Sequence, residues 1–346
     1  MRMMPAEWAP QSGVILTWPH QHGDWADNLA QTEKTFTELA AHISQQETAL
    51  IICWNHEHIS HVRQLLANHP AVNLLRVILT LAPSNDSWAR DHAPITVIDN
   101  GRPVLLDFTF NGWGNKYPST LDNEITRRLY AEGVFGDTPL YHSDMVLEGG
   151  SIDSNGQGVL LTTSRCLLSP ARNPHMNRDE IDLVLREQLG VTTIHWLEHG
   201  ALDGDDTDSH IDMLARFCNE TTIAYTQCPD ANDSQHDELN LMEKELQALQ
   251  TANGNAYDLV PLPLPAPVYN HDGKRLPASY ANFLIINEAV LVPVYGDPAD
   301  ELAISRLQQC FQQRTVIPVS CRSLIEQYGS LHCVSMQLAA DVLPRE

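Results

Sequence analysis

A fixed order of predicted elements repeats along this chain and limits the folds that it can adopt. Two short β-strands joined by a tight turn are followed by a helix and then by one more apolar strand. In the clearest copy, residues 145–152 and 158–163 form a predicted hairpin across Ser154-Asn-Gly156, a strong turn signal. Residues 178–189 follow with helical spacing of apolar side chains, and a strand is predicted at 192–197.

Three further stretches have the same order, and a last copy is divided between the two ends of the chain. The predicted elements of the three internal copies are the hairpins 95–99 with 103–110, 211–217 with 221–227 and 281–286 with 290–295, the helices 122–132, 235–250 and 299–312, and the strands 257–262 and 315–319. In the divided copy, strand 332–338 is expected to pair with strand 13–17, followed by a helix at 25–46 and a strand at 48–54. Residues 58–81 add one helix and one strand as an insertion.

Five similar units cannot each bury an apolar face alone, but they can do so by packing around a common axis. The repeat therefore predicts one closed α/β domain spanning residues 1–346 rather than two domains. The Pro-rich stretch 261–267 then fits an extended loop between two units instead of a linker. Corresponding strand positions in such a ring point toward the axis, so residues far apart in the sequence can meet there.

Charge and cysteine content limit the partners and the compartment. The chain has 44 Asp and Glu against 21 Lys and Arg, a formal net charge of −23, which repels phosphate backbones and attracts small cations. We therefore expect no nucleic-acid partner and favour a small cationic substrate. Seven cysteines without a Cys-x-x-Cys pair, no signal-peptide pattern and no stretch of about 18 apolar residues predict a cytoplasmic protein without a membrane segment.

The chemically unusual residues fall at matching places in the repeat. Trp88-Ala-Arg-Asp91 lies just before one hairpin, Glu148-Gly-Gly150 lies in the first strand of the next, and His210-Ile-Asp212 opens the third. His332-Cys333 opens the terminal strand. Each signal is weak when taken alone. Together, one Cys, one His, one Glu and two Asp near one axis are hard to explain as packing, because buried charges must be paired.

A buried cation supplied by the substrate would pair these charges, and a guanidinium group suits them best. It is planar, stays protonated far above neutral pH, and presents N–H groups that two or three carboxylates can bind through bidentate bonds. Its central carbon is a poor electrophile, so a thiolate is a suitable nucleophile. A histidine can then protonate the departing ammonia and accept a proton from the hydrolytic water.

The motifs along the chain also resemble those of a known family. They are Met4-Pro-Ala-Glu-Trp8, Thr17-Trp-Pro-His20, Asn85-Asp-Ser-Trp-Ala-Arg-Asp91, Phe110-Asn-Gly-Trp-Gly114, Leu147-Glu-Gly-Gly150, Asp205-Asp-Thr-Asp-Ser-His-Ile-Asp212 and His332-Cys333. In this order they look like the agmatine deiminase (agmatine iminohydrolase) family, and the match runs from about residue 4 to 338. The resemblance implies a guanidino-group-modifying enzyme with the five-bladed α/β propeller called the pentein fold.

The resemblance also implies a role for each matching residue. Cys333 would be the nucleophile that forms a thiouronium adduct with loss of ammonia, and His210 would act as general acid and then as general base. Asp91 and Asp212 would clamp the guanidinium nitrogens, while Glu148 would pair with His210 and the guanidinium region. Agmatine would give N-carbamoylputrescine and ammonia, a step of putrescine and polyamine biosynthesis, with no metal or organic cofactor.

Substrate recognition away from the reacting carbon is less defined. Trp88 matches an aromatic residue that lines the substrate channel in this family, and ordinary packing explains it equally well. Asp206 and Asp208 belong to an acidic run that could bind the second amine of agmatine. The loop before the nucleophile is commonly Gly-rich in the family, but here Ser330 and Leu331 precede His332, which can change its shape.

The residues leave other readings open. A free-arginine or peptidylarginine deiminase shares the chemistry, but free arginine would need a cation for its carboxylate, with Arg90, Lys116 and Arg172 as candidates. The amine of agmatine would instead be bound by the acidic run 203–208.

Two further readings use no nucleophilic cysteine. A metal-dependent hydrolase could place Zn²⁺ or Mn²⁺ on Asp206, Asp208, His210 and Asp212, which alternate along a strand-like run. An inactive scaffold could bind polyamines through its negative charge. The sequence leaves open whether the chain forms a homo-oligomer.

Overall fold

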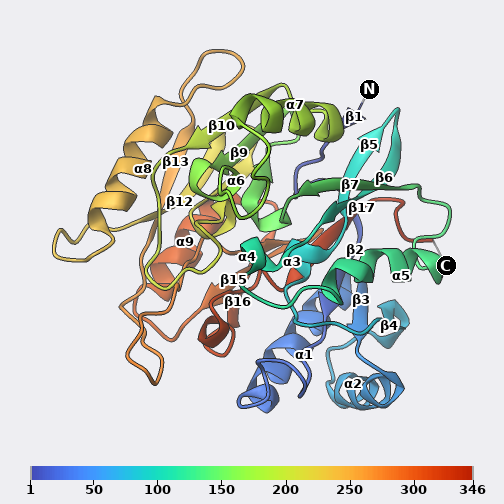
Figure 1. Ribbon diagram of the computed structural model, residues 1–346. Coiled ribbons are helices and arrows are strands. Elements are labelled where there is room, and N and C mark those ends of the chain that lie inside the picture. Colours follow the sequence, from blue (N-terminus) through green and yellow to red (C-terminus); the bar gives the residue numbers. More distant parts are fainter. Residues whose placement is uncertain (1, 345–346) are drawn as a thin grey trace.

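The strands among residues 2–344 form five separate sheets that share one plan (Figure 1). The computed structural model describes residues 2–344. In each sheet an antiparallel pair is followed by a strand that runs parallel to the second member of the pair. The order of elements predicted from the sequence is therefore confirmed.

Four sheets come from consecutive stretches of the chain. Their antiparallel pairs are β5 (Ile95–Asp99) with β6 (Arg102–Thr109), β8 (Ile152–Ser154) with β9 (Val159–Thr163), β11 (Ala215–Asn219) with β12 (Thr222–Gln227) and β14 (Leu284–Ile285) with β15 (Ala289–Val294). Their parallel strands are β7 (Leu140–Val146), β10 (Thr193–Leu197), β13 (Asp258–Pro263) and β16 (Thr315–Ser320). The short strand β1 (Arg2–Met3) adds to the edge of β5.

The fifth sheet joins the two ends of the chain. Strand β17 (Ser335–Ala339) pairs antiparallel with β2 (Gln11–Thr17), with Ser335 opposite Leu16 and Gln337 opposite Val14. Strand β3 (Thr48–Cys53) runs parallel to β2, and β4 (Val77–Leu81) extends the sheet as the predicted insertion. The pairing of the amino-terminal strand with the strand after Cys333 is therefore confirmed.

Helices connect the strands within each unit. The longer ones are α1 (Leu29–Gln46), α2 (His56–Asn68), α5 (Ile125–Ala131), α7 (Arg178–Leu189), α8 (His236–Ala248) and α9 (Asp300–Cys310). Helix α7 begins with a capping box between Asn177 and Glu180, ends at the left-handed Gly190, and buries Ile181, Leu185 and Leu189. In Figure 1 the longer helices α1, α2, α7 and α8 lie toward the outside of the view, and the short helices α3 (Ala89–His92) and α4 (Gly112–Asn115) lie near its middle. No helix among residues 2–344 is long and apolar enough to cross a membrane.

Several predicted strand boundaries were wrong, and the errors share one cause. Residues 145–152 are not one strand, because β7 closes the preceding unit and β8 starts only at Ile152. Strands β11, β14 and β17 likewise start three or four residues later than predicted. In three of these places the residues before the strand bond to their own turn, as when Ser151 N donates to Glu148 O, Met213 N to His210 O and Ser335 N to His332 O. Local turns therefore replace the strand pairing that the apolar pattern predicts.

Candidate active site

The turns that precede the first strands of the units carry the residues expected at the site. Asp91 lies in α3, Glu148 immediately precedes the 3₁₀ turn Gly149–Ser151, and Asp212 lies in the 3₁₀ turn Ile211–Met213 directly after His210. Cys333 lies in the turn before β17. All five side chains are buried, with between 0% and 7% of their surface exposed. The matching positions in the repeat therefore bring together residues from four different units, as the sequence predicts.

Gly150 is the point at which three of these side chains meet. A Cβ atom built on Gly150 would lie 2.7 Å from Nδ1 of His210, 2.8 Å from Oδ1 of Asp91 and 3.1 Å from Oδ2 of Asp212. The backbone N–H of Gly150 donates to Oδ1 of Asp91 at 2.9 Å, and Trp113 Nε1 donates to Oδ2 of Asp91 at 2.9 Å. Both oxygens of Asp91 are therefore fixed, and no residue larger than glycine fits beneath the cluster.

Cys333 contacts Asp212 and a residue that the sequence analysis did not select. Its Sγ atom lies 3.6 Å from Oδ2 of Asp212 and accepts a hydrogen bond from Nδ2 of Asn282 at 3.2 Å. Oδ1 of Asn282 in turn accepts the backbone N–H of His332 at 2.9 Å, so Asn282 fixes both the thiol and its loop. Asn282 occupies the corresponding turn before β14. Its position before the first strand of a unit, which it shares with the other site residues, is the sequence signal that could have identified it.

Glu148 is bound to Arg172, which the sequence suggested only as a possible partner for the carboxylate of free arginine. Nε of Arg172 contacts both carboxylate oxygens of Glu148 at 2.9 Å, and Nη1 of Arg172 bonds to Oδ2 of Asp208 at 2.7 Å. The guanidinium of Arg172 is fully buried, so the charge of Glu148 is neutralised by the chain itself. A carboxylate oxygen of Glu148, the Sγ atom of Cys166 and a ring nitrogen of His210 lie within 4.8 Å of one another. Glu148 is therefore close to His210.

The electrostatics of the cluster favour a positive charge among its carboxylates. Burial raises the pKa of Asp91 from 3.8 to about 6; His210 opposes this rise and Asp212 adds to it. Burial also acts to raise the pKa of Asp212, but the hydrogen bond and charge of His332 reverse the direction and lower it. Burial opposes the charged form of His210, yet Asp91, Cys166 and Glu148 hold its pKa well above 6.5. These neighbours therefore favour the charged form of His210.

The thiol of Cys333 lies in an environment that disfavours its charged form. Burial raises the pKa of Cys333 well above 9.0, and the carboxylates of Asp212 and Asp91 raise it further. A cation bound between these carboxylates would reverse their effect. Cys333 is thus placed to become a thiolate when a positively charged group enters the site.

Part of this cluster lines a small cavity of about 20 Å³. Its walls include Trp88, Asp91, Asp206, Asp212, Tyr328 and Cys333. The ring of Trp88 packs on Gly329, where an added Cβ would lie 2.2 Å from Cζ3 of the ring. The family pattern places glycines in this loop, and Gly329 is the one that the close approach of Trp88 requires. Ser330 bonds to the hydroxyl of Tyr295 at 3.2 Å, and Leu331 is buried in the core.

Asp206 and Asp208 of the acidic run have different surroundings. Asp206 lines the cavity, and its Oδ2 accepts the hydroxyl of Tyr117 at 2.8 Å. Asp208 binds Arg172 and, at 2.7 Å, Nζ of Lys116, so two cations of the chain already occupy it. The run is not strand-like, because Asp208 and Ser209 both have positive φ and a 3₁₀ turn follows.

The geometry does not assemble the metal site considered from the sequence. Within residues 2–344, the side chains close enough to share a metal ion are those of Glu148, Cys166 and His210. Asp206, Asp208 and Asp212 are not part of that group. Both oxygens of Glu148 face Arg172, which further disfavours a cation at this point. The four-residue metal hypothesis is therefore not supported by the arrangement of the chain.

Comparison with known proteins identifies the family of this chain. Residues 3–339 match the model of the Porphyromonas-type peptidyl-arginine deiminase family. The chain belongs to this family. It is 35% identical to an agmatine deiminase of Stutzerimonas stutzeri (strain A1501), with 97% of this chain and 95% of that protein covered. The resemblance to agmatine deiminases predicted from the motifs is confirmed at this level.

Solved structures of the family have the same fold. A cysteine-to-serine variant of the C. jejuni agmatine deiminase with substrate bound has a TM-score of 0.90 and 38% identity, covering 98% of this chain and 96% of that one. A Porphyromonas gingivalis protein that carries the provisional name arginine deiminase has a TM-score of 0.94 and 45% identity, with 99% and 100% covered. The family members similar to this chain thus carry two different substrate names.

Proposed function

We propose that the protein is an agmatine deiminase, which hydrolyses agmatine to N-carbamoylputrescine and ammonia. The observation that carries this proposal is the position of Cys333, whose thiol lines a cavity together with the carboxylates of Asp91 and Asp212. A planar guanidinium held by these two carboxylates would present its central carbon to the thiol. The relatives named agmatine deiminase support the same substrate.

The proposed reaction begins with attack on the guanidinium carbon. The thiolate of Cys333 forms a C–S bond to it, and one C–N bond breaks as ammonia leaves with a proton from His210. Water then adds to the thiouronium carbon while His210 accepts a proton from that water. As the C–S bond breaks, the proton of the added hydroxyl passes to sulfur, which releases N-carbamoylputrescine and restores the thiol. That proton leaves to solvent when the thiolate forms for the next turnover. Asp91 and Asp212 clamp the guanidinium nitrogens, and Glu148, held by Arg172, supports the charge of His210.

Agmatine fits the far end of the site better than free arginine does. The three cations considered for an arginine carboxylate are already engaged, because Arg90 binds Glu7 and Gln337, Lys116 binds Asp208, and Arg172 binds Glu148. In contrast, Asp206 lines the cavity, and the hydroxyl of Tyr117 donates to its Oδ2 and orients this carboxylate. We therefore assign the distal amine to Asp206 rather than to Asp208, with Trp88 as an aromatic wall.

Two substitutions test this assignment. Asp206→Asn removes a charge that faces the cavity, so the KM for agmatine should rise about tenfold with little change in kcat. Asp208→Asn instead frees Lys116 and Arg172, so its main effect should be on kcat through Glu148. An unchanged agmatine KM in a folded Asp206→Asn variant would remove Asp206 from the binding site.

We also propose the finer features of the fold and its context. The five sheets would be the blades of a pentein propeller, formed by a single domain over residues 1–346, with the site at its axis. Support comes from the repeated sheet plan and from the pairing of β17 with β2. All seven cysteines are free, which suits the cytoplasm. An experimental structure in which the sheets do not surround Cys333 would contradict the propeller.

The reaction itself is tested by product analysis. Agmatine, free arginine and a blocked peptidyl arginine would be compared for ammonia release, with Cys333→Ala as the matched control and with product mass determined. Conversion of agmatine to N-carbamoylputrescine, lost in the variant, is the expected result. Turnover of arginine or peptide instead would keep the chemistry and change the substrate. Activity that falls after EDTA dialysis but survives iodoacetamide would support the metal-dependent alternative.

A further inference from the structure

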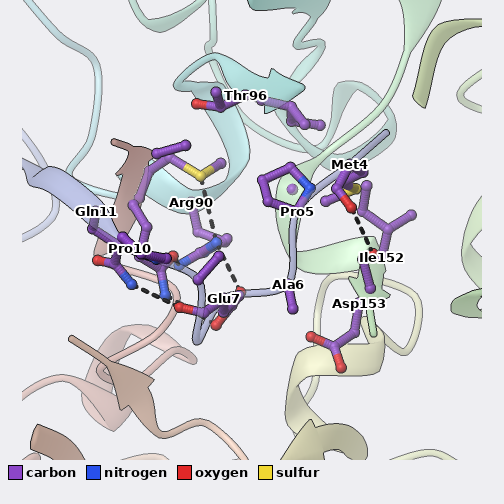
Figure 2. Close-up of a pocket in the computed structure, with 17 residues that line it drawn as sticks. Met4, Pro5, Ala6, Glu7, Pro10, Gln11, Arg90, Thr96, Ile152 and Asp153 are labelled. Atoms are coloured by element: carbon purple, nitrogen blue, oxygen red, sulfur yellow. Dashed lines mark hydrogen bonds and ion pairs between the residues drawn. The ribbon is translucent and has the colours of Figure 1, made fainter. Parts of the chain in front are cut away.

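A buried ionic network lies directly beneath the candidate site, and Glu7 is its centre. Oε1 of Glu7 contacts Nη1 of Arg90 at 3.2 Å and Nε2 of His332 at 2.7 Å. Its Oε2 accepts from Gln337 at 2.9 Å and also from Arg216. Figure 2 shows Glu7 and Arg90 turned toward one another beside the amino-terminal segment, with Asp153 nearby. The amino-terminal segment is therefore joined to the strand that follows Cys333.

His332 connects this network to the site itself. Its Nδ1 lies 2.7 Å from Oδ2 of Asp212, and its Nε2 lies 2.7 Å from Oε1 of Glu7. The His332 side chain is fully buried. Each imidazole nitrogen therefore lies within hydrogen-bond distance of one carboxylate oxygen, while burial and the charges of Arg216 and Arg90 lower the pKa of His332. The imidazole is thereby fixed from both sides.

The contact with His332 makes the two oxygens of Asp212 unequal. Oδ2 is occupied by His332 and lies 3.6 Å from Sγ of Cys333. Oδ1 is buried and has no hydrogen-bond partner within the described chain. A buried carboxylate oxygen without a partner is costly, and a donor from a bound ligand would satisfy it. The hydrogen bond from His332 also keeps the pKa of Asp212 low, so this oxygen carries negative charge.

We propose that His332 is a positioning residue, held by Glu7, that fixes Oδ2 of Asp212 and thereby leaves Oδ1 for the guanidinium of the substrate. This inference rests on the proposed function, because it assigns a purpose to the orientation of Asp212. It also explains why a segment at the amino terminus reaches the site without contacting the cavity. Glu7 does not line the cavity that contains Cys333.

Two substitutions of His332 separate its two contacts. In His332→Asn the amide nitrogen takes the place of Nδ1 and keeps the contact with Asp212, whereas in His332→Gln it takes the place of Nε2 and keeps the contact with Glu7. Both would be made in a Cys333→Ser background, and the Kd for agmatine would be measured calorimetrically. We expect His332→Gln to bind agmatine about tenfold more weakly than His332→Asn, the loss typical of one charge-assisted hydrogen bond. Equal affinities in folded variants would overturn the inference.

Asp153→Asn is the matched control for the network as a whole. Asp153 is buried and binds Nε of Arg216 at 3.0 Å, but it does not contact His332 or Asp212. This variant should lose thermal stability and keep the affinity for agmatine. If His332→Gln does not fold, Glu7→Gln tests the same chain of contacts, from Glu7 through His332 to Asp212, at its Glu7 end. Its Kd for agmatine should be about threefold above that of Asp153→Asn. Equal Kd values for those two variants would also overturn the inference.

A ligand-free measurement distinguishes failure of this inference from failure of the proposed function. Without His332, the charge on Oδ2 of Asp212 is no longer shared, so the pKa of the Cys333 thiol should rise. The same two His332 substitutions would be made with Cys333 retained, and alkylation of Cys333 by iodoacetamide at pH 8 should then be slower in His332→Gln than in His332→Asn. A difference in alkylation without any binding of agmatine would support the positioning role and reject the substrate. Equal alkylation rates together with equal affinities would reject the positioning role alone.

Discussion

Two buried cysteines lie near different members of the same cluster of ionisable residues, and their surroundings differ in charge. Burial raises the pKa of both thiols. At Cys333 the nearby carboxylates Asp212 and Asp91 add to this rise, whereas at Cys166 the cations Arg172 and His210 oppose it. By charge alone Cys166 would be the better thiolate, but only Cys333 lines the cavity.

This difference shows why the surroundings of the free protein do not identify the nucleophile. The carboxylates that disfavour a thiolate at Cys333 are the groups that would bind a guanidinium. Once that cation is bound, it cancels their effect and favours the thiolate beside the carbon to be attacked. Cys333 would therefore be activated by the substrate, and a reactive thiol would not be exposed in its absence.

Replacing each of the two cysteines by alanine should have the largest effect and tests most directly whether their roles differ. Cys333→Ala should lower kcat/KM for agmatine about 10⁴-fold or more, because no other group can form the covalent adduct. Cys166→Ala should stay within about tenfold of the wild type, since it removes only a neighbour of His210. Steady-state kinetics on both variants checks this, and severe loss in Cys166→Ala with survival of Cys333→Ala would reverse the assignment.

Gly150→Ala tests whether the carboxylates near Cys333 act as one cluster. The new methyl group would clash with His210 and Asp91, so these side chains must shift apart, and a shift of about 1 Å can cost on the order of 10²-fold in kcat/KM. Gly101→Ala is the control for strain without a clash, because nothing lies within 4 Å of its added Cβ although its positive φ of 79° strains any residue other than glycine. If the two variants have equal activity, the cluster is not under the steric constraint described.

The pH dependence of binding tests the charge that distinguishes Cys333. Asp91 faces His210, Asp212, Glu148 and Trp113, and its pKa in the folded protein is about 6, against 3.8 without the fold. Its contribution to the free energy of unfolding is therefore present at low pH and is lost as pH rises through about 6. Because the guanidinium needs the ionised form, agmatine binding should strengthen by about tenfold per pH unit up to pH 6. Calorimetry with Cys333→Ser checks this, and Asp91→Asn should weaken binding and remove Asp91's share of the dependence.

The sequence was sufficient to predict the unit order and that Asp91, His210, Asp212 and Cys333 would lie close together. Turn signals such as Asn100-Gly101 and the apolar spacing of the helices depend on local chemistry, so they can be read without the fold. The family motifs then selected Cys333, His210 and Asp91. Boundaries were less predictable, because turns before the strands keep the apolar pattern of a strand while bonding locally.

The partners of these residues could not be predicted in the same way. Arg172 contacts Glu148 only once the chain has folded. The residues next to Arg172 in the sequence do not indicate that its guanidinium is fully buried. The acidic run alternates like a strand, yet positive φ angles at Asp208 and Ser209 turn Asp208 toward cations of the chain. Such pairings depend on which units lie side by side, which is a property of the fold.

Asn282 gives the test with the smallest expected effect. The thiol of Cys333 accepts a hydrogen bond from the neutral amide of Asn282, whereas the thiol of Cys166 lies near His210. Asn282→Ala removes the donor to Sγ and the acceptor for His332 N–H. The loss of a neutral hydrogen bond should reduce kcat/KM about three- to tenfold and slow iodoacetamide alkylation of Cys333. Asn282→Asp places a further carboxylate beside the thiol, so the alkylation rate at pH 8 should fall below that of Asn282→Ala. If the aspartate variant were instead the faster of the two, the thiol at Cys333 would not be controlled by the carboxylates around it, and the contrast with Cys166 would need another cause.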